Sequence, residues 1–292
     1  MHPLEQFQSL RTLLRTAKGG IFSRKMPFRS HGFGSSCSGP AVAILISCVA
    51  AISVFAQGMR LDQIPPPRQG YTFPEKQTLT YSVDWRVFPA GTAVIRFSSE
   101  GDTEHITATA DTIGAINLLF HVSDRFQSAF DRQKGCSYEF DKQTTEGRRQ
   151  VNATLHLDYN QSKAVFDQKN MVNGQTKHLE SPIHGCVTDL LSGIFYTSSL
   201  PLEIGHNFVL PVFDAQHIVQ VTMKVEDREE VRTPLGTYNT IRVQPTADAG
   251  VVKNRGDIWI WYTDDDRHLP VQMRARLFWG TITFRLIGLE NK

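Results

Sequence analysis

The polar run Asp264-Asp265-Asp266-Arg267-His268 is the segment whose residue types could most directly do chemistry. Neighbouring carboxylates can bind a divalent cation, and a carboxylate beside a histidine can transfer protons in general acid–base catalysis. The run has neither the central glycine nor the distal glutamate of a calcium-binding EF-hand loop. Because it lies between two apolar segments, 258–263 and 271–277, it favours a solvent-exposed turn between two strands. The alternative is a hydrolase that uses Asp264, Asp265 or His268.

Other patterns that would indicate an enzyme or a metal protein are missing from the sequence. There is no H-E-x-x-H or H-x-H histidine spacing, no P-loop, no G-x-G-x-x-G and no G-x-S-x-G. Ser192-Gly193 lacks the preceding glycine of a nucleophile elbow and falls in a segment with helical spacing. We therefore expect no catalytic residue, no metal and no cofactor.

Tryptophan provides a different kind of candidate site. In Ile258-Trp259-Ile260-Trp261-Tyr262 both faces of the predicted strand are apolar, and Trp279 lies at the junction of two further strands. Such a strand either is central to a two-layer core, which we favour, or lends its second face to a ligand-binding concavity. On the second interpretation Trp259, Trp261 and Trp279 would bind an apolar ligand such as a lipid.

The amino-terminal segment has the pattern of a secretory signal peptide. Fifteen uncharged, mostly apolar residues at 41–55 follow a leader with six basic residues and one acidic residue, and Val54-Phe55-Ala56 precedes Gln57. This pattern predicts cleavage between Ala56 and Gln57. The alternative is a retained anchor, for which the apolar run is short of the ~20 residues that span a bilayer. Any membrane attachment would then be through the uncleaved leader.

Two details of the leader stay open. A start at Met26 would give a leader of ordinary length, whereas a start at Met1 gives an unusually long one. The sequence Leu45-Ile46-Ser47-Cys48 loosely resembles a lipobox, which would make Cys48 a lipidated amino terminus. The apolar run continues past Cys48, however, and this favours a cysteine within the signal core.

Charge and cysteine content describe the remaining chain. The full sequence has a formal net charge of +2, but residues 57–292 contain 25 basic and 28 acidic residues. This mildly acidic balance argues against binding to nucleic acid and against electrostatic docking on anionic lipid. Cys136 and Cys186 are the cysteines outside the leader. In an oxidising compartment they can form a disulfide, worth about 4 kcal/mol for a loop of this length, or they can be two separate buried thiols.

Alternating apolar and polar residues predict an all-β, mainly antiparallel fold. The alternation is clear at 79–87, 151–159 and 219–226, and turn signals such as Pro89-Ala90-Gly91 and Asn173-Gly174 separate about a dozen strands. For Asn173-Gly174 we expect a type I′ hairpin turn. Two short helices are expected at 113–120 and 188–196, the second capped by Thr188. We predict a Pro-rich linker at 57–74 and one β domain at 75–292, folded as a single curved sheet, an open β-barrel or a half-barrel.

Several short motifs, in a fixed order, resemble the family called domain of unknown function 3108. They are Leu79-Thr-Tyr-Ser-Val-Asp-Trp85, Pro89-Ala-Gly-Thr-Ala93, Asp189-Leu-Leu-Ser192, Thr233-Pro-Leu-Gly-Thr-Tyr238, Ile258-Trp259, Asp264-Asp265 and Pro270-Val271. The resemblance covers roughly 73–289. It implies an exported bacterial protein with a signal peptide and a curved antiparallel sheet, and it carries over no catalytic residue because the family has no established activity.

These observations lead to one functional expectation and one alternative. We expect a non-catalytic protein of the periplasm or cell envelope of a Gram-negative-type bacterium that binds an apolar ligand or lipid on its curved sheet. The alternative is a module that assembles with other envelope proteins.

Overall fold

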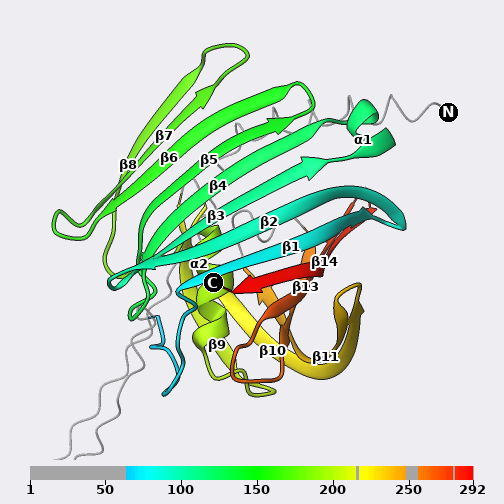
Figure 1. The fold of residues 1–292 in the computed structure, drawn as a ribbon. Helices are drawn as coiled ribbons and strands as arrows, with labels where there is room; N and C mark the ends of the chain where they lie inside the picture. Colours follow the sequence, from blue (N-terminus) through cyan, green and yellow to red (C-terminus); the bar gives the residue numbers. More distant parts are fainter. Residues whose placement is uncertain (1–63, 215–216, 248–255, 279, 292) are drawn as a thin grey trace, which may run out of the picture. The chain divides into compact units, whose positions relative to one another are not determined.

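The computed structural model describes residues 64–214, 217–247, 256–278 and 280–291. The predicted leader, the cleavage site at Ala56 and Gln57, Met26, Cys48 and Trp279 all lie outside these residues. The described chain is almost entirely β-structure in one antiparallel sheet of fourteen strands, with two short α-helices (Figure 1). The predicted all-β fold is therefore confirmed. Among the described residues, no helix has the length and apolar character needed to cross a membrane.

The strands follow one another as a meander that folds back on itself. Their order across the sheet is β8-β7-β6-β5-β4-β3-β2-β1-β14-β13-β12-β11-β10-β9, so the first and last strands pair in the middle, and β8 and β9 are the two edges. The strands are β1 Lys76–Trp85, β2 Phe88–Glu100, β3 Thr103–Thr112, β4 Val122–Asp131, β5 Ser137–Glu146, β6 Arg149–Asp158, β7 Lys163–Asn170, β8 Thr176–Pro182, β9 Asn207–Phe213, β10 Ile218–Thr233, β11 Gly236–Thr246, β12 Asp257–Thr263, β13 Pro270–Leu277 and β14 Gly280–Asn291.

The β7–β8 connection confirms the predicted hairpin but not its turn type. Strand β7 ends at Asn170 and β8 begins at Thr176, so the connection is longer than the two residues of a type I′ turn. Gly174 has a positive φ of 73°, whereas Asn173 does not have a positive φ. The side chain of Asn170 accepts a hydrogen bond from the Val172 N–H and organises the longer turn.

Pro89-Ala90-Gly91 was predicted as a turn and instead lies inside β2. The chain already reverses at Arg86 and Val87, and Arg86 takes the positive φ of 58° there. Gly91 is required for a different reason, because a Cβ at this position would lie 2.5 Å from the carbonyl oxygen of Asp111 on β3. The glycine therefore permits close strand approach and does not form a turn.

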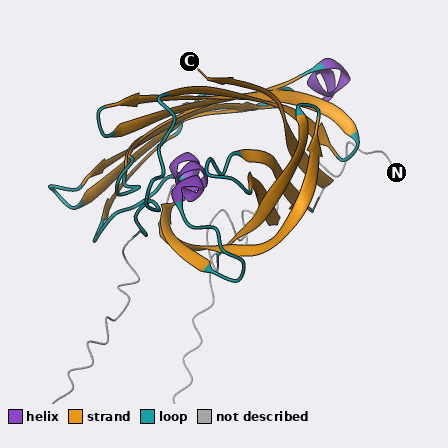
Figure 2. Ribbon diagram, turned by 60° about the horizontal axis from the view of Figure 1, so that its bottom comes forward, coloured by secondary structure: helices purple, strands orange, loops and turns teal. Residues whose placement is uncertain are grey.

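The sheet curls around helix α2, Leu190–Tyr196, which lies inside the curve (Figure 2). The predicted helix is confirmed, but its N-cap is Asp189 and not Thr188. Thr188 is extended and forms a bridge with Val212 of β9. Asp189 forms a capping box with Ser192, in which each side chain accepts a hydrogen bond from the other residue's backbone N–H.

The Asp189 carboxylate is fully buried and tied to two distant strands. Its Oδ2 accepts hydrogen bonds from Ser128 Oγ on β4 at 2.6 Å and Ser137 Oγ on β5 at 2.7 Å. Its Oδ1 accepts from the backbone N–H groups of Leu191 and Ser192 at 2.8 and 3.0 Å. Burial raises the pKa of Asp189, whereas these hydrogen bonds lower it. The four donors fix the start of α2 against β4 and β5.

The segment just before α2 connects two strands that are not neighbours in the sheet. The Ser137 N–H of β5 donates to the Val187 carbonyl at 2.8 Å, and the Thr188 N–H donates to the Pro211 carbonyl of β9 at 2.8 Å. A disulfide between Cys136 and Cys186 holds the same segment to the start of β5. We call residues 186–189 the clasp, because they join edge strand β9 to β5.

Side chains fill the space between α2 and the inner face of the sheet. The largest fully buried ones include Tyr81, Phe130, Tyr196 and Tyr262. Phe195 of α2 contacts Phe97 of β2 edge to face, with ring centroids 4.8 Å apart. The described part of the predicted linker belongs to this core, since Ile64 and Phe73 are buried. Residues 64–74 are thus packed on the β domain.

Glu104 on β3 is a buried acid with incomplete hydrogen bonding. Its Oε2 accepts from Ser99 Oγ at 2.7 Å, while Oε1 has no hydrogen-bond partner. Burial raises the pKa of Glu104 to about 7, although the Ser99 hydrogen bond and the nearby Arg132 oppose the shift. The carboxyl group is therefore most stable in this site when it carries a proton.

We predict that Asp189→Ala lowers the free energy of unfolding by about 3 kcal/mol or more, because it removes the cap and leaves two buried serine hydroxyls without their acceptor. Asp158→Ala is the matched control: Asp158 also accepts two backbone N–H groups, but at an exposed turn. There we expect a loss of about 1 kcal/mol. Urea denaturation measures both, and equal losses would show that the buried network contributes nothing beyond an ordinary cap.

The raised pKa of Glu104 predicts a pH-dependent stability. Between its ordinary value near 4.5 and about 7, the folded state binds a proton that the unfolded state has released, so the free energy of unfolding falls as pH rises. The total loss is roughly 3 kcal/mol. Glu104→Gln should be similar to the parent protein at low pH and more stable at slightly alkaline pH.

Urea denaturation of both proteins across this pH range tests the prediction. Burial also raises the pKa of Asp124, to about 6, but that contribution is common to both proteins and cancels in the difference. Two parallel stability curves would contradict the assignment to Glu104.

Candidate functional site

The two described candidate tryptophans lie on the face of the sheet opposite to α2. Along β12, Ile260 and Tyr262 point toward the core, where the Tyr262 hydroxyl donates to the Ile194 carbonyl of α2 at 2.7 Å. Side chains alternate between the two faces of a strand, so Trp259 and Trp261 project from the other face. The strand is thus apolar on both sides, as the sequence indicated, and the two faces have different surroundings.

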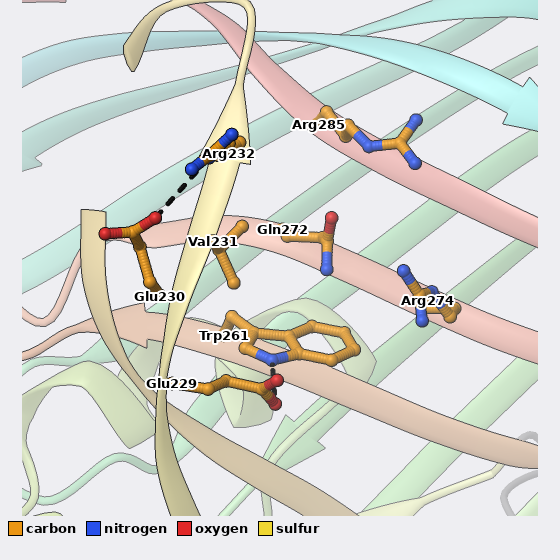
Figure 3. A pocket seen from close by; sticks show the side chains of 8 residues that line it. All are labelled: Glu229, Glu230, Val231, Arg232, Trp261, Gln272, Arg274 and Arg285. Atoms are coloured by element: carbon orange, nitrogen blue, oxygen red, sulfur yellow. Dashed lines mark hydrogen bonds and ion pairs between the residues drawn. The ribbon is translucent and has the colours of Figure 1, made fainter. Parts of the chain in front are cut away.

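The end of β10 passes over this second face and forms a cleft with it (Figure 3). One cavity of about 280 Å³ is lined by Glu229, Glu230, Val231, Arg232, Trp261, Gln272, Arg274 and Arg285. A second, of about 340 Å³, is lined by Glu226, Arg242, Gln244, Trp259, Trp261 and Arg274. Because the two cavities share Trp261 and Arg274, we treat them as one site and call it the Trp261 cleft.

Hydrogen bonds hold the central indole in place. Trp261 is 4% exposed, and its Nε1–H donates to Glu229 Oε1 at 2.8 Å. The same carboxylate oxygen accepts from Arg242 Nη1 at 2.7 Å, and Arg242 Nε donates to Glu226 Oε2 at 2.8 Å. Glu226 and Glu229 therefore share one arginine, and the three groups together keep a net negative charge.

Arg274 is the cation of the Trp261 cleft that lacks a carboxylate partner. Its guanidinium lies 5.2 Å from the Trp261 ring centroid, which is a cation–π contact. Among the described residues no carboxylate lies within ion-pair distance of Arg274, whereas Arg232 and Arg285 each have one and Arg242 has two. Burial and the neighbouring Arg285 lower the pKa of Arg274, whereas Glu229 raises it. The guanidinium of Arg274 thus has hydrogen-bond donors that no carboxylate of the described residues occupies.

Gln272 adds a second polar group to the lining of the cleft. It lies two residues before Arg274 on the same face of β13 and is 5% exposed, yet its side-chain amide has no hydrogen-bond partner within the described part of the chain. Figure 3 shows Gln272 and Arg274 on neighbouring positions beside the Trp261 ring. A guanidinium and an amide that both lack partners can donate hydrogen bonds to the oxygens of an anion.

The acidic run at 264–268 is a structured turn between β12 and β13. Asp264 forms an ion pair with Arg228 at 2.7 Å. Asp265 accepts from Thr263 Oγ1 at 2.7 Å and pairs with Arg267, and these contacts lower its pKa. His268 is buried, its Nδ1 lies 2.7 Å from Arg68 Nη1, and burial and Arg68 lower its pKa. The side chains of Asp264, Asp265 and His268 are thus engaged in local contacts, and none of them lines the Trp261 cleft.

Metal ligands and nucleophiles are not gathered elsewhere in the described ranges. No group of three or more His, Cys, Asp or Glu side chains there could hold a metal ion. Cys136 and Cys186 are joined in the disulfide. Ser137 and Ser192 lie 2.7 Å apart beside Asp189, but all three residues are fully buried in the network that begins α2. A substrate could not reach these hydroxyls in this conformation.

The family model for proteins of unknown function, DUF3108, matches residues 80–287, which is most of the chain. The chain belongs to the DUF3108 family. This match covers both the clasp and the Trp261 cleft. None of the curated proteins matches the sequence.

A solved structure is similar to this DUF3108 chain in fold. It is the β-barrel-like protein of domain of unknown function DUF1849 from Brucella abortus, with 11% sequence identity and a TM-score of 0.49. The similarity covers 75% of this chain and 98% of that chain.

Sequence reasoning found Trp259 and Trp261 but missed the polar residues around them. Gln272 and Arg274 alternate with Val271 and Met273, which alone indicates only a solvated strand face. The missing information is the pairing of β12 with β13, which places Trp261 beside Gln272 and Trp259 beside Arg274. The short connection between β12 and β13 is a sequence feature that could have indicated this pairing, because two strands joined by a short turn pair antiparallel.

Proposed function

We propose that this protein is an exported, non-catalytic binding protein of the bacterial cell envelope whose ligand is an amphiphile with an anionic head group. The observation that carries this proposal is the pair formed by Arg274 and Gln272. In the Trp261 cleft Gln272 is buried and Arg274 is partly buried, and no carboxylate of the described chain forms an ion pair with Arg274.

An anionic head group would supply the missing acceptors. The guanidinium of Arg274 can donate two parallel hydrogen bonds to a phosphate or carboxylate, and Gln272 can donate a third. The faces of Trp259 and Trp261, with Val231, offer apolar surface to the rest of the molecule. A wholly apolar ligand would remove Arg274 and Gln272 from water without accepting hydrogen bonds from them, and this desolvation costs free energy. An amphiphile therefore fits the lining better than a plain hydrocarbon.

Two observations support export. The sequence at 1–57 has the pattern of a signal peptide and its cleavage site. The Cys136–Cys186 disulfide is of the kind that persists in oxidising compartments such as the periplasm. The absence of a catalytic pattern in the sequence favours binding over turnover.

We predict that octyl phosphate, used below its micelle-forming concentration, binds the protein and changes its tryptophan fluorescence. Arg274→Gln should weaken this binding about tenfold to a hundredfold, because it removes a charged hydrogen bond in a partly desolvated site. Arg125→Gln is the control, since Arg125 lies on β4 and pairs with Asp111. Its affinity should equal that of the parent protein.

Inorganic phosphate and octanol represent the two parts of octyl phosphate, the anionic head group and the alkyl chain, and their binding can be measured separately. We expect each to bind more weakly than octyl phosphate, because each makes only half of the contacts. Equal affinity for phosphate and octyl phosphate would show a free-anion site and contradict the amphiphile. Unchanged octyl phosphate affinity in Arg274→Gln would contradict the role of the Trp261 cleft.

A further inference from the structure

Large apolar side chains are exposed together at one end of the sheet. They are Val87 in the β1–β2 connection and Phe88 at the start of β2, Leu118 and Leu119 in helix α1, Gly114–Leu119, and Phe278 in the β13–β14 connection. These five residues are between 58% and 88% exposed. We call them the apolar rim.

The three connections are neighbours. The Ile113 N–H, just before α1, donates to the Ala90 carbonyl of β2 at 3.0 Å. The Arg86 N–H, between β1 and β2, donates to the Thr281 carbonyl of β14 at 2.7 Å. In Figure 1 the α1 and β1–β2 connections project together at the right of the sheet, where β14 begins. The rim residues therefore form one surface at this end.

Helix α1 is not explained by packing within the described chain. Its sequence is GAINLL, none of its residues is buried, and no side chain caps its amino terminus. A helix this short has little stability in water on its own, and an exposed cluster of leucine and phenylalanine is typical of an interaction surface. The rim is thus suited to contact something apolar.

Charges beside the rim favour an anionic partner. The carboxylates of Asp111, Glu146 and Asp257 at this end are each paired with an arginine. Arg148 is exposed in the β5–β6 connection and adds positive charge. Arginine side chains are therefore frequent at this end, although residues 57–292 as a whole contain more acidic than basic residues.

We propose that the apolar rim inserts into the surface of an anionic lipid bilayer. Separate turn tips that carry Leu, Phe and Val, flanked by arginine, match the chemistry of the headgroup boundary, where apolar side chains enter the acyl region and cations contact lipid phosphates. The proposal goes beyond the binding function of the Trp261 cleft, since it concerns other residues and another surface. It gives the β domain a peripheral position on the membrane surface.

Sedimentation with vesicles of equal parts phosphatidylethanolamine and phosphatidylglycerol tests the proposal. The protein is purified in the form that the expressing cell exports, and intact mass confirms the same amino terminus in every variant. The triple variant Leu118→Ser, Leu119→Ser and Phe278→Ser should bind at least about tenfold more weakly than the parent protein. Vesicles of phosphatidylcholine alone should bind the parent protein more weakly, because they lack net negative charge.

The double variant Ile204→Ser and Leu235→Ser is the matched control. Both residues are exposed and apolar but lie at the other end of the strands. It should sediment like the parent protein. No vesicle binding by the parent protein, or equal binding by the triple variant, would overturn the proposal. So would a parent dimer that the triple variant dissociates without any change in vesicle binding, since a second copy would then cover the rim.

The outcome is separate from that of the proposed ligand site. The triple variant should keep the parent affinity for octyl phosphate, and Arg274→Gln should keep the parent vesicle binding.

Discussion

The buried carboxylate of Asp189 is the interaction on which the rest of the structure depends. A carboxylate in the protein interior is costly unless its oxygens are satisfied, and here four donors from three chain segments satisfy them. The same residue ends the clasp and begins α2. It thereby directs the chain from the edge of the sheet into its centre, where the disulfide and the bridge to β9 hold the clasp in place.

Placing α2 inside the curve determines which surfaces are available for function. The side chains of Phe195, Tyr196 and Tyr262 fill the space between the helix and the inner face of the sheet. The space around α2 is therefore occupied by the protein's own side chains. The two candidate recognition surfaces are instead on the outside. They are the Trp261 cleft, where Arg274 has no ion-pair partner among the described residues, and the apolar rim at one end of the strands. We infer that the inner face supplies stability and the outer surfaces supply recognition.

Much of the fold could be predicted from the sequence because it depends on local patterns. The alternating segment at 151–159 corresponds to β6, in which Val151, Leu155 and Leu157 are buried. Features set by long-range contacts could not be predicted in the same way. Asp189 and not Thr188 caps α2 because Ser128 and Ser137 reach it from strands more than fifty residues away in the sequence. Gly91 looked like a turn residue because the nearby carbonyl of Asp111 becomes visible only once β2 and β3 are paired. The tryptophans of the site could be recognised from residue type and position along one strand. Arg274 could be assigned to the site only once the β12–β13 register, which pairs it with Trp259, was known.

Hydrogen–deuterium exchange with and without octyl phosphate tests most directly whether recognition occurs on the outer face. The account predicts slower exchange in peptides from β12 and β13, which contain Trp261, Gln272 and Arg274, and no change in peptides from the clasp and α2. Slower exchange confined to the clasp and α2 would contradict it, because the ligand would then enter the interior that these side chains fill.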